Sequence, residues 1–180
     1  MTIEISGSKE SAVEKFTVRR ITESDLGDFR ELRLEALRLH PDAFGASYDE
    51  CTLKPLHFFA EQLRNSHVFG GFDLHNTLQG MIGVNRSSLP KLSHVANIWG
   101  MYVRAEMRSS GLSSRLMEAA LEVASSAKTV KLSVVTTNRA AYALYHSFGF
   151  TEWATDTAAL CVDGVFHDEF LMRLDSESGS

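Results

Sequence analysis

The sequence has few cysteines, and their positions favour unpaired residues over a disulfide or a cysteine-based metal site. Its two cysteines, Cys51 and Cys161, lie far apart and lack the short spacings of zinc ligands. A chain of 180 residues can bury about 70% of its unfolded surface, which provides one core without covalent cross-links. We therefore expect both cysteines to be unpaired small hydrophobic residues. The seven histidines also lack ligand spacing, so we expect no metal.

Long apolar runs and an excess of basic residues are absent as well. No stretch approaches the roughly 20 apolar residues that cross a bilayer. The N-terminal sequence MTIEISGSKES has neither the basic leader nor the apolar segment of a signal peptide. The net charge of -5 argues against a general nucleic-acid-binding protein, which needs clustered Lys and Arg. We therefore expect a cytoplasmic protein with no membrane or nucleic-acid partner.

Hydrophobic periodicity predicts one domain over residues 16–174, between polar ends at 1–15 and 175–180 that we expect to be flexible. Alternating and β-branched segments predict strands at 16–21, 67–72, 78–84, 94–103, 130–136, 150–160 and 166–174. Apolar spacing and capping residues predict helices at 22–39, 55–65, 113–127 and 138–148, with an irregular stretch at 41–50. Turn-prone residues join two pairs of these strands, so the sheet is expected to be at least partly antiparallel.

The segment 101–113, with the sequence MYVRAEMRSSGLS, has the features of an anion-binding loop. Its small residues let the backbone approach a ligand, and the helix that follows begins with unpaired N–H groups and a partial positive charge. Arg108 adds a permanent cation. Similar loops also cap helices in proteins that bind nothing. The patterns of P-loop and dinucleotide-binding proteins are both missing, so a pyrophosphate here would belong to another kind of ligand.

A second segment, 138–150, follows the buried strand expected at 130–136 and reads NRAAYALYHSFGF. Asn138 is placed to cap a short helix, and Tyr145 lies seven residues later on nearly the same helical face. By themselves these residues indicate a helix cap and a half-buried aromatic side chain. Their shared face also allows both to line one site.

Together the two segments resemble the acyl-CoA-binding motif and the following helix motif of the GNAT superfamily of N-acyltransferases. The pattern V-x-x-x-x-R-x-x-G-x-small precedes a helix and a buried strand, and N-x-x-A-x-x-L-Y-x-x-x-G-F comes next, in the family's order. The sequences at 33–37 and 41–45 also resemble the first helix and loop of many small members. The resemblance extends over residues 16–174. It implies an α/β, three-layer fold with a mixed, mostly antiparallel sheet of about seven strands and about four helices, splayed at the strand before the CoA loop.

The resemblance implies acetyl-CoA as co-substrate and no metal. By position, the backbone of Met101 and Val103 would bind the acyl and pantetheine groups. The pyrophosphate would lie on the loop formed by Arg108, Ser109, Ser110, Gly111, Leu112 and Ser113. Tyr145 matches the family's general acid, which protonates the CoA thiolate, and Asn138 matches a residue that contacts the cofactor or ordered water. Relatives are often homodimers, so a homodimer is possible.

Two departures from the family pattern are visible in the sequence. Many relatives have a glutamate on the strand before the loop, but 94–103 contains no acidic residue, so the general base is unassigned. The candidates are Glu31, Glu35, Asp49 and His94. Serine stands at 109 and 113, where glycine or another small residue is common; if either position needs a positive φ, serine would strain the loop by about 1 kcal/mol or more.

The acceptor is expected to be a primary amine of a small molecule or protein. Variable connections at 41–50 and 86–93 and the last hairpin are expected to select it. Glu35, Phe44 and Trp99 are candidate acceptor-site residues. Two functions remain open at this point: an acetyl-CoA-dependent N-acetyltransferase, or a noncatalytic CoA-binding or regulatory module of the same fold. A longer acyl-CoA as donor is a third alternative, because the sequence does not give the depth of the cleft.

Overall fold

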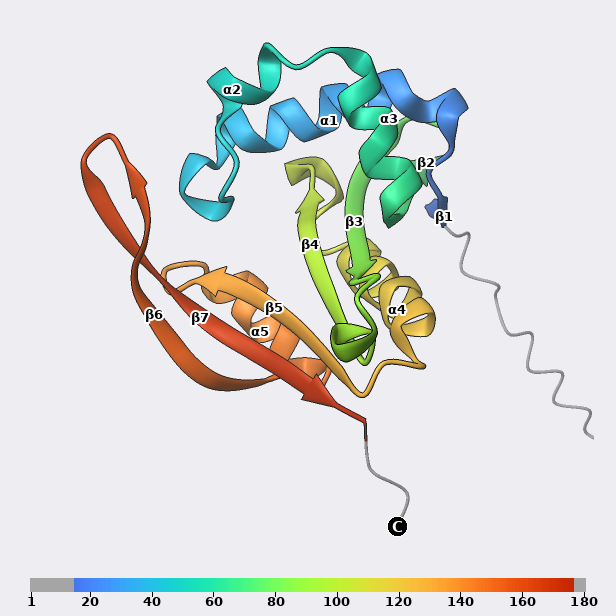
Figure 1. Cartoon of the computed structure of the whole chain (residues 1–180). Coiled ribbons are helices and arrows are strands. Elements are labelled where there is room, and N and C mark those ends of the chain that lie inside the picture. The colour runs from blue at the N-terminus through green and yellow to red at the C-terminus, as the bar shows by residue number, and fades with distance from the viewer. Residues whose placement is uncertain (1–14, 177–180) are drawn as a thin grey trace, which may run out of the picture.

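The computed structural model describes residues 15–176, and at its centre is a seven-stranded mixed sheet (Figure 1). The strand order is β1-β2-β3-β4-β5-β7-β6. Only the β4–β5 pair is parallel, and the other neighbours are antiparallel. The strands are β1 Phe16–Arg20, β2 His67–Asp73, β3 Leu78–Arg86, β4 Val95–Val103, β5 Thr129–Val135, β6 Thr151–Val162 and β7 Val165–Asp175. This confirms the expected mixed, mostly antiparallel sheet of about seven strands. The ends predicted to be flexible fall largely outside the described residues.

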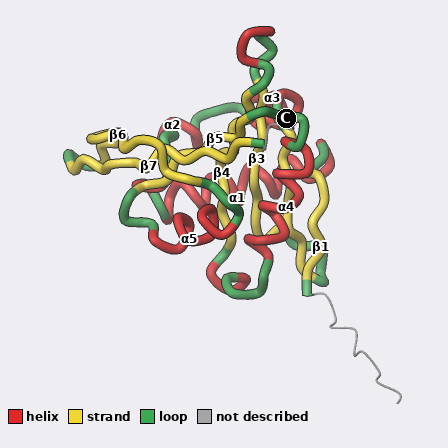
Figure 2. Tube along the Cα trace, turned by 90° about the horizontal axis from the view of Figure 1, so that it is seen from below, coloured by secondary structure: helices red, strands yellow, loops and turns green. Residues whose placement is uncertain are grey.

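Five α-helices within residues 15–176 cover the two faces of the sheet and form a three-layer arrangement (Figures 1 and 2). On one face lie α1 Leu26–Leu39, α2 Tyr48–Thr52 and α3 Leu56–Asn65; on the other lie α4 Leu112–Ala124 and α5 Arg139–Ser147. The short α2 corrects the prediction of an irregular 41–50 segment. It is a little over one turn long and is capped by Ser47, whose Oγ accepts a hydrogen bond from the N–H of Glu50 at 3.4 Å. None of the helices among the described residues is long and apolar enough to cross a membrane.

Separate hydrophobic clusters form on the two faces because successive strand residues point to opposite sides. On β3, Met81 packs with α1 and α3, whereas its neighbour Ile82 packs with α4. Leu116 and Met117 of α4 are completely buried in the second cluster. Both free cysteines fit this picture of a core without cross-links, with Cys51 buried and Cys161 exposed. The two clusters hold the central strands in place from both sides.

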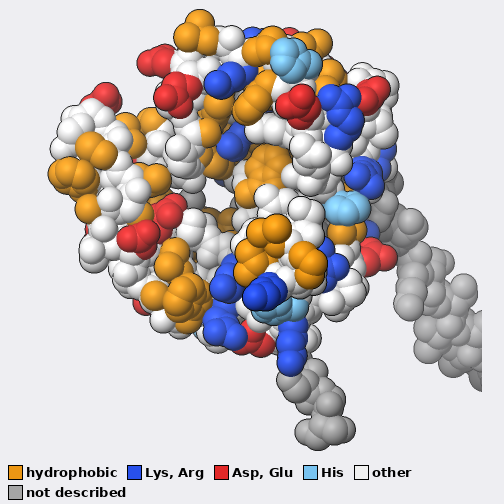
Figure 3. All heavy atoms as spheres, viewed as in Figure 1, with side chains coloured by type: hydrophobic (Ala, Val, Ile, Leu, Met, Phe, Trp, Pro, Cys, Tyr) orange, Lys and Arg blue, Asp and Glu red, His pale blue; other side chains and the backbone are white. Residues whose placement is uncertain are grey.

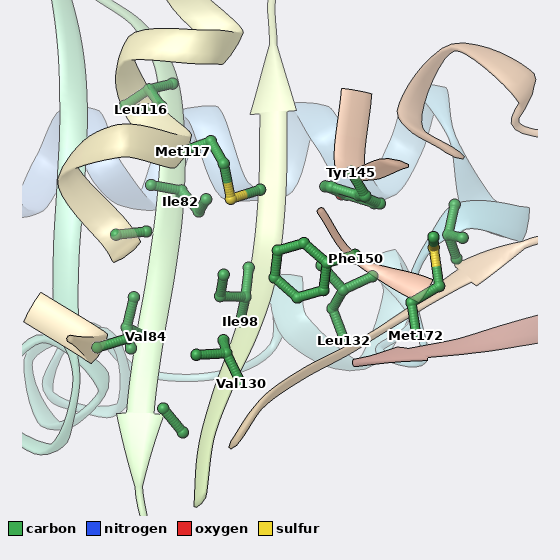
Figure 4. Packing of buried hydrophobic residues seen from close by; sticks show 14 of the residues in the cluster. Ile82, Val84, Ile98, Leu116, Met117, Val130, Leu132, Tyr145, Phe150 and Met172 are labelled. Carbon is green, nitrogen blue, oxygen red and sulfur yellow. The ribbon is translucent and has the colours of Figure 1, made fainter. Parts of the chain in front are cut away.

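The sheet is splayed between β4 and β5, as expected. Their pairing ends after Asn97 and Lys131, so the two strands separate along the rest of β4. A bulge on β4 adds one residue opposite β3 between Trp99 and Tyr102, and Gly100 in this bulge has a φ of 66°. The fully buried Phe150 fills the lower part of the gap, between side chains of β4 and β5 (Figure 4). Above this wedge, the gap is open to ligands.

Candidate active site

Two adjoining cavities occupy the open part of the gap between β4 and β5. The larger cavity, of about 640 Å³, extends from the end of β4 and the loop before α4 to the start of α5. The smaller cavity, of about 210 Å³, lies between β4 and the middle of β5, and Glu169 of β7 contributes to its wall. Met101, Asn138 and Ala141 line both, so the two cavities meet at these residues. In the space-filling view the molecule is hollowed between the β6–β7 hairpin and the upper helical layer (Figure 3).

The loop before α4 forms one end of the larger cavity. Ser109 has a φ of 61°, and Gly111, the residue before α4, has a φ of 90°. These left-handed residues turn the chain so that α4 begins at Leu112, where the first N–H groups of the helix have no partner within it. Arg108 lies on the cavity wall and contacts His40, with 3.3 Å between Nη2 and Nε2. The N–H of Leu112 donates to Oγ of Ser110 at 3.3 Å. The remaining N–H groups of the first turn, the helix dipole and the guanidinium together suit a pyrophosphate.

Ser109 and Ser113 are the two loop serines at which the sequence allowed for backbone strain, and only Ser109 is strained. Ser109 adopts a positive φ, a conformation that costs a non-glycine residue about 1 kcal/mol or more. Ser113 lies inside the first turn of α4 and has no positive φ. Ser110 stabilises the strained loop, because its Oγ donates to the carbonyl of Met107 at 2.7 Å. The loop is therefore held in shape by local hydrogen bonds.

The free edge of β4 provides the second element of the larger cavity. On its other edge β4 pairs with β3, where Tyr102 lies opposite Met81 and Val103 opposite Gly80. Beyond Asn97 the edge facing β5 has no strand partner among the described residues. Backbone N–H and C=O groups on this edge can therefore bind an extended ligand. Met101 and Val103, predicted from the sequence to contact the acyl and pantetheine groups, both line the larger cavity.

Asn138 and Tyr145 lie together on the wall of the smaller cavity. Asn138 caps α5, and its Oδ1 accepts a hydrogen bond from the N–H of Ala141 at 3.1 Å. Tyr145 is 6% exposed, and its ring packs against Phe150 with 6.2 Å between ring centroids. Burial raises the pKa of Tyr145 to about 12 because the charged phenolate would lose its hydration. The phenol is therefore protonated at neutral pH and available as a donor beside the cavity.

Of the three residues predicted for the acceptor site, the structure brings two to the smaller cavity. Phe44, in the loop after α1, and Trp99, on β4, both line it. The guanidinium of Arg33 lies near both rings, with Cζ 5.0 Å from the Phe44 centroid and 5.7 Å from the Trp99 ring. Arg33 and Glu169 are the charged residues in this wall, and the sequence reasoning assigned a role to neither. Glu169 lies opposite Val135 in the pairing of β7 with β5. The alternation of side chains along β7 was the sequence signal that could have placed Glu169 beside the predicted strand β5.

Glu35, the third of these predicted residues, lines neither cavity and is bound within the protein. Its Oε2 accepts from Nη2 of Arg104 at 2.7 Å, and its Oε1 accepts from the hydroxyl of Tyr102 at 2.9 Å. These bonds join α1 to the end of β4. The role that they indicate for Glu35 is structural, because a carboxylate engaged in this way is poorly placed to bind an acceptor or remove its proton.

The other candidate bases also lie outside the smaller cavity. Glu31 and His94 are exposed, and His94 precedes β4, whereas the cavities are at the strand's other end. Asp49 lines a separate hollow against the tip of the β6–β7 hairpin. No group of three His, Cys, Asp or Glu residues within 15–176 is arranged to hold a metal ion.

The Glu35 ion pair leads to a prediction about stability. We expect Glu35→Gln to lower the free energy of unfolding by about 1–2 kcal/mol at pH 7, and the melting temperature by roughly 2–8 °C. Arg104 holds the pKa of Glu35 below its ordinary value of 4.5. The stabilisation is therefore fully present above that value and is lost as the pH falls through the folded-state pKa.

Thermal denaturation between pH 7 and pH 3 tests this prediction, with the exposed Glu31→Gln on the same helix as control. The difference between wild type and Glu35→Gln should shrink below about pH 4, whereas Glu31→Gln should have little effect at any pH. A difference that stays constant down to pH 3 would show that the carboxylate charge does not stabilise the fold.

Comparison with known proteins gives a family match and several structures of similar fold. The profile of the acetyltransferase (GNAT) family matches residues 30–150. Comparison with curated protein sequences gives no significant match. Among solved structures, a GNAT-family acetyltransferase from Streptococcus pneumoniae aligns with a TM-score of 0.74 at 20% identity, covering 89% of this chain and 99% of that one.

Two further structures show the same fold. One is the putative acetyltransferase YncA from Salmonella typhimurium, solved with its cofactor acetyl-CoA. It aligns with a TM-score of 0.74 at 20% identity, and the alignment covers 92% of this chain and 96% of that one. The ribosomal-protein-alanine N-acetyltransferase from Brucella melitensis has a TM-score of 0.75 at 20% identity, with coverages of 89% and 99%. At these identities the structures establish the shared fold.

Proposed function

The chain belongs to the acetyltransferase (GNAT) family, and on this premise we propose that it is an N-acetyltransferase that moves an acetyl group from acetyl-CoA to a primary amine. The observation that carries the proposal is the pair of connected cavities. They lead from an anion-binding loop, along an unpaired strand edge, to a buried and protonated tyrosine. An extended, pyrophosphate-containing thioester and a small acceptor can meet at their junction.

The residues present fit acetyl-CoA. The loop at 108–113 offers N–H groups and Arg108 for the pyrophosphate, and the free edge of β4 at Met101 and Val103 offers backbone hydrogen bonds for pantetheine. When bound, acetyl-CoA supplies a thioester carbonyl that an amine can attack. Asn138 lies where the two cavities meet and is placed to contact the pantetheine chain or a bound water.

Tyr145 is the proposed proton donor in direct transfer. The C–N bond forms as the amine attacks, the C–S bond breaks, and the phenol gives its proton to the departing sulfur. The proton that the amine nitrogen loses then restores the phenol, so the products are an amide and a neutral thiol. The buried environment keeps Tyr145 protonated before each turnover, because its pKa is about 12.

Heat denaturation with acetyl-CoA tests the cofactor site without knowledge of the acceptor. A ligand at 100 times its Kd stabilises the native state by about 2.7 kcal/mol, which should raise the melting temperature by roughly 5–10 °C. Arg108→Glu should abolish most of this shift, because it places a carboxylate beside the pyrophosphate loop.

The matched control is Arg64→Glu, which makes the same charge change at an exposed position of α3. It should retain the full shift. Absence of any shift in wild type at millimolar acetyl-CoA would refute the proposed function.

A further inference from the structure

The smaller cavity is lined by a buried cation that makes no ion pair with another residue of 15–176. Arg33 on α1 is 8% exposed, and its Nη1 is buried without a hydrogen-bond partner among the described residues. Its neighbours include the rings of Phe44 and Trp99 and the thiol of Cys51. It also lines a separate hollow of about 350 Å³ together with Glu61 and Gln62, without an ion pair to Glu61. Burial of an unpaired guanidinium is costly, and this desolvation lowers the pKa of Arg33. Such a group is most stable when an anion enters the cavity and pairs with it.

Arg33 lies on the wall of the cavity in which transfer would occur. It lines the smaller cavity together with Gly100 and Tyr145, and a Cβ added at Gly100 would lie 3.6 Å from its Nη1. Because residue 100 is glycine, no side chain of the β4 bulge stands against the guanidinium. The neighbouring Trp99 also has a buried indole N–H without a partner among the described residues. The indole ring lies over Gly83 of β3, on the side of β4 away from β5, so Arg33 is the donor left for an oxyanion in the cavity.

The opposite charge in the cavity is Glu169, which reaches the wall from β7. Its carboxylate makes no hydrogen bond or ion pair with another residue of 15–176. Arg33 and Glu169 are the charged residues that line the cavity, and they come from α1 and β7, on different sides of the β4–β5 gap. One cation and one anion in a small cavity suit a ligand that carries both charges.

Resting on the proposed function, we propose that the acceptor is a small anionic amine, in particular an amino carboxylate, whose carboxylate pairs with Arg33 while its amine lies beside Glu169 and Tyr145. Arg33 is then the residue that selects the acceptor. The carboxylate receives hydrogen bonds from the guanidinium, and Glu169 attracts the ammonium group, which gives one proton to solvent water before the neutral amine attacks. An acceptor that carries a cationic or apolar group in place of the carboxylate would leave Arg33 buried and unpaired.

The test compares matched acceptors. Release of CoA thiol is measured with a panel of α-, β- and γ-amino carboxylates and with their carboxamides, which keep the amine and side chain but lose the negative charge. Aminoalkylphosphonates in the same panel distinguish a carboxylate from a phosphonate. We expect at least one amino carboxylate or aminophosphonate to be acetylated with a kcat/KM roughly 10- to 100-fold above that of its neutral analogue.

Arg33→Met provides the residue-specific test because methionine fills similar space without charge. It should reduce the preference for the anionic acceptor by the same roughly 10- to 100-fold, mainly through KM, and Arg33→Lys should restore part of it. Its melting temperature should match or exceed that of wild type, since an unpaired buried charge is removed. Its thermal shift with acetyl-CoA should be unchanged, because Arg33 does not line the larger cavity. Arg38→Met, at an exposed position of the same helix, is the control and should keep the wild-type preference.

The outcomes separate this inference from the proposed function. If acetyl-CoA binds but neutral amines are acetylated as well as anionic ones, or no anionic amine is acetylated, the inference fails and the cofactor site stands. An unchanged preference in Arg33→Met also overturns it. If acetyl-CoA causes no thermal shift in wild type, the proposed function itself fails.

Discussion

Replacement of Tyr145 by phenylalanine is expected to lower kcat by about 100- to 10,000-fold, the range typical of a lost general acid. The hydroxyl is the only group removed, and the ring that packs 6.2 Å from Phe150 remains. Stability should therefore change little. The affinity for acetyl-CoA should also be nearly unchanged, because the larger cavity is lined by α5 residues other than Tyr145. A loss confined to kcat would assign the hydroxyl to the reaction itself.

Steady-state kinetics and the acetyl-CoA thermal shift, measured on the same preparations, check this prediction. Tyr142→Phe is the matched control: this hydroxyl is on the same helix, and its ring lies against His146 and Phe170 without lining either cavity. It should keep wild-type turnover. Equal kcat values for wild type and Tyr145→Phe would remove Tyr145 from the mechanism. If wild type binds acetyl-CoA but acetylates no amine, the alternative of a noncatalytic CoA-binding module is favoured.

Much of the fold was predictable because local signals and burial agree along most of the chain. The expected cap at Thr22 exists as a capping box with Asp25, and Asn138 caps α5 through its side chain. The β-branched run at 130–136 became β5, which lies between two other strands of the sheet. The turn at Asp163 and Gly164 joins β6 to β7, and both residues have positive φ. In each case a single short pattern was sufficient because tertiary contacts reinforce it.

The parts that were missed depend on contacts between distant residues. The helix α2 spans Tyr48–Thr52 and is too short to show an apolar period. From the sequence alone, Glu35 could not be told from a solvated or a catalytic carboxylate. Its ion pair with Arg104, which lies 69 positions later in the chain, appears only in the folded structure. Arg33 and Glu169 are 136 positions apart in the numbering and come together only because β7 inserts beside β5. No local pattern encodes such a pairing.

The splay between β4 and β5 connects these observations to function. Two parallel strands normally continue to pair, and opening them leaves backbone groups without partners. Here Phe150 lies as a wedge below the gap, between Ile98 and Leu132 (Figure 4). The burial of its ring offsets part of the free-energy cost of the unpaired backbone groups. The same residue supports Tyr145 from below. We therefore expect one buried aromatic side chain to support both the fold and the position of Tyr145.

We expect Phe150→Ala to lower the free energy of unfolding by about 3–5 kcal/mol, the range for removal of a buried phenylalanine. Phe150 is completely buried, so its loss leaves a cavity at the point where β4 and β5 separate. The melting temperature should fall by roughly 6–20 °C. The strands can close into this space and Tyr145 loses its support, so turnover should fall by more than the loss of folded protein explains.

Phe150→Leu keeps most of the volume and prevents the test from depending on a variant that does not fold. It should cost less stability than alanine and still reduce kcat, because leucine does not reproduce the flat surface under Tyr145. Phe166→Ala, at a position that is 67% exposed, is the control and should alter neither property. Thermal denaturation gives the stability, and initial rates corrected for the folded fraction give the activity. If both Phe150 variants retain the full corrected kcat, Phe150 is only a core residue, and the geometry of the gap is set by the β4 bulge at Gly100 instead.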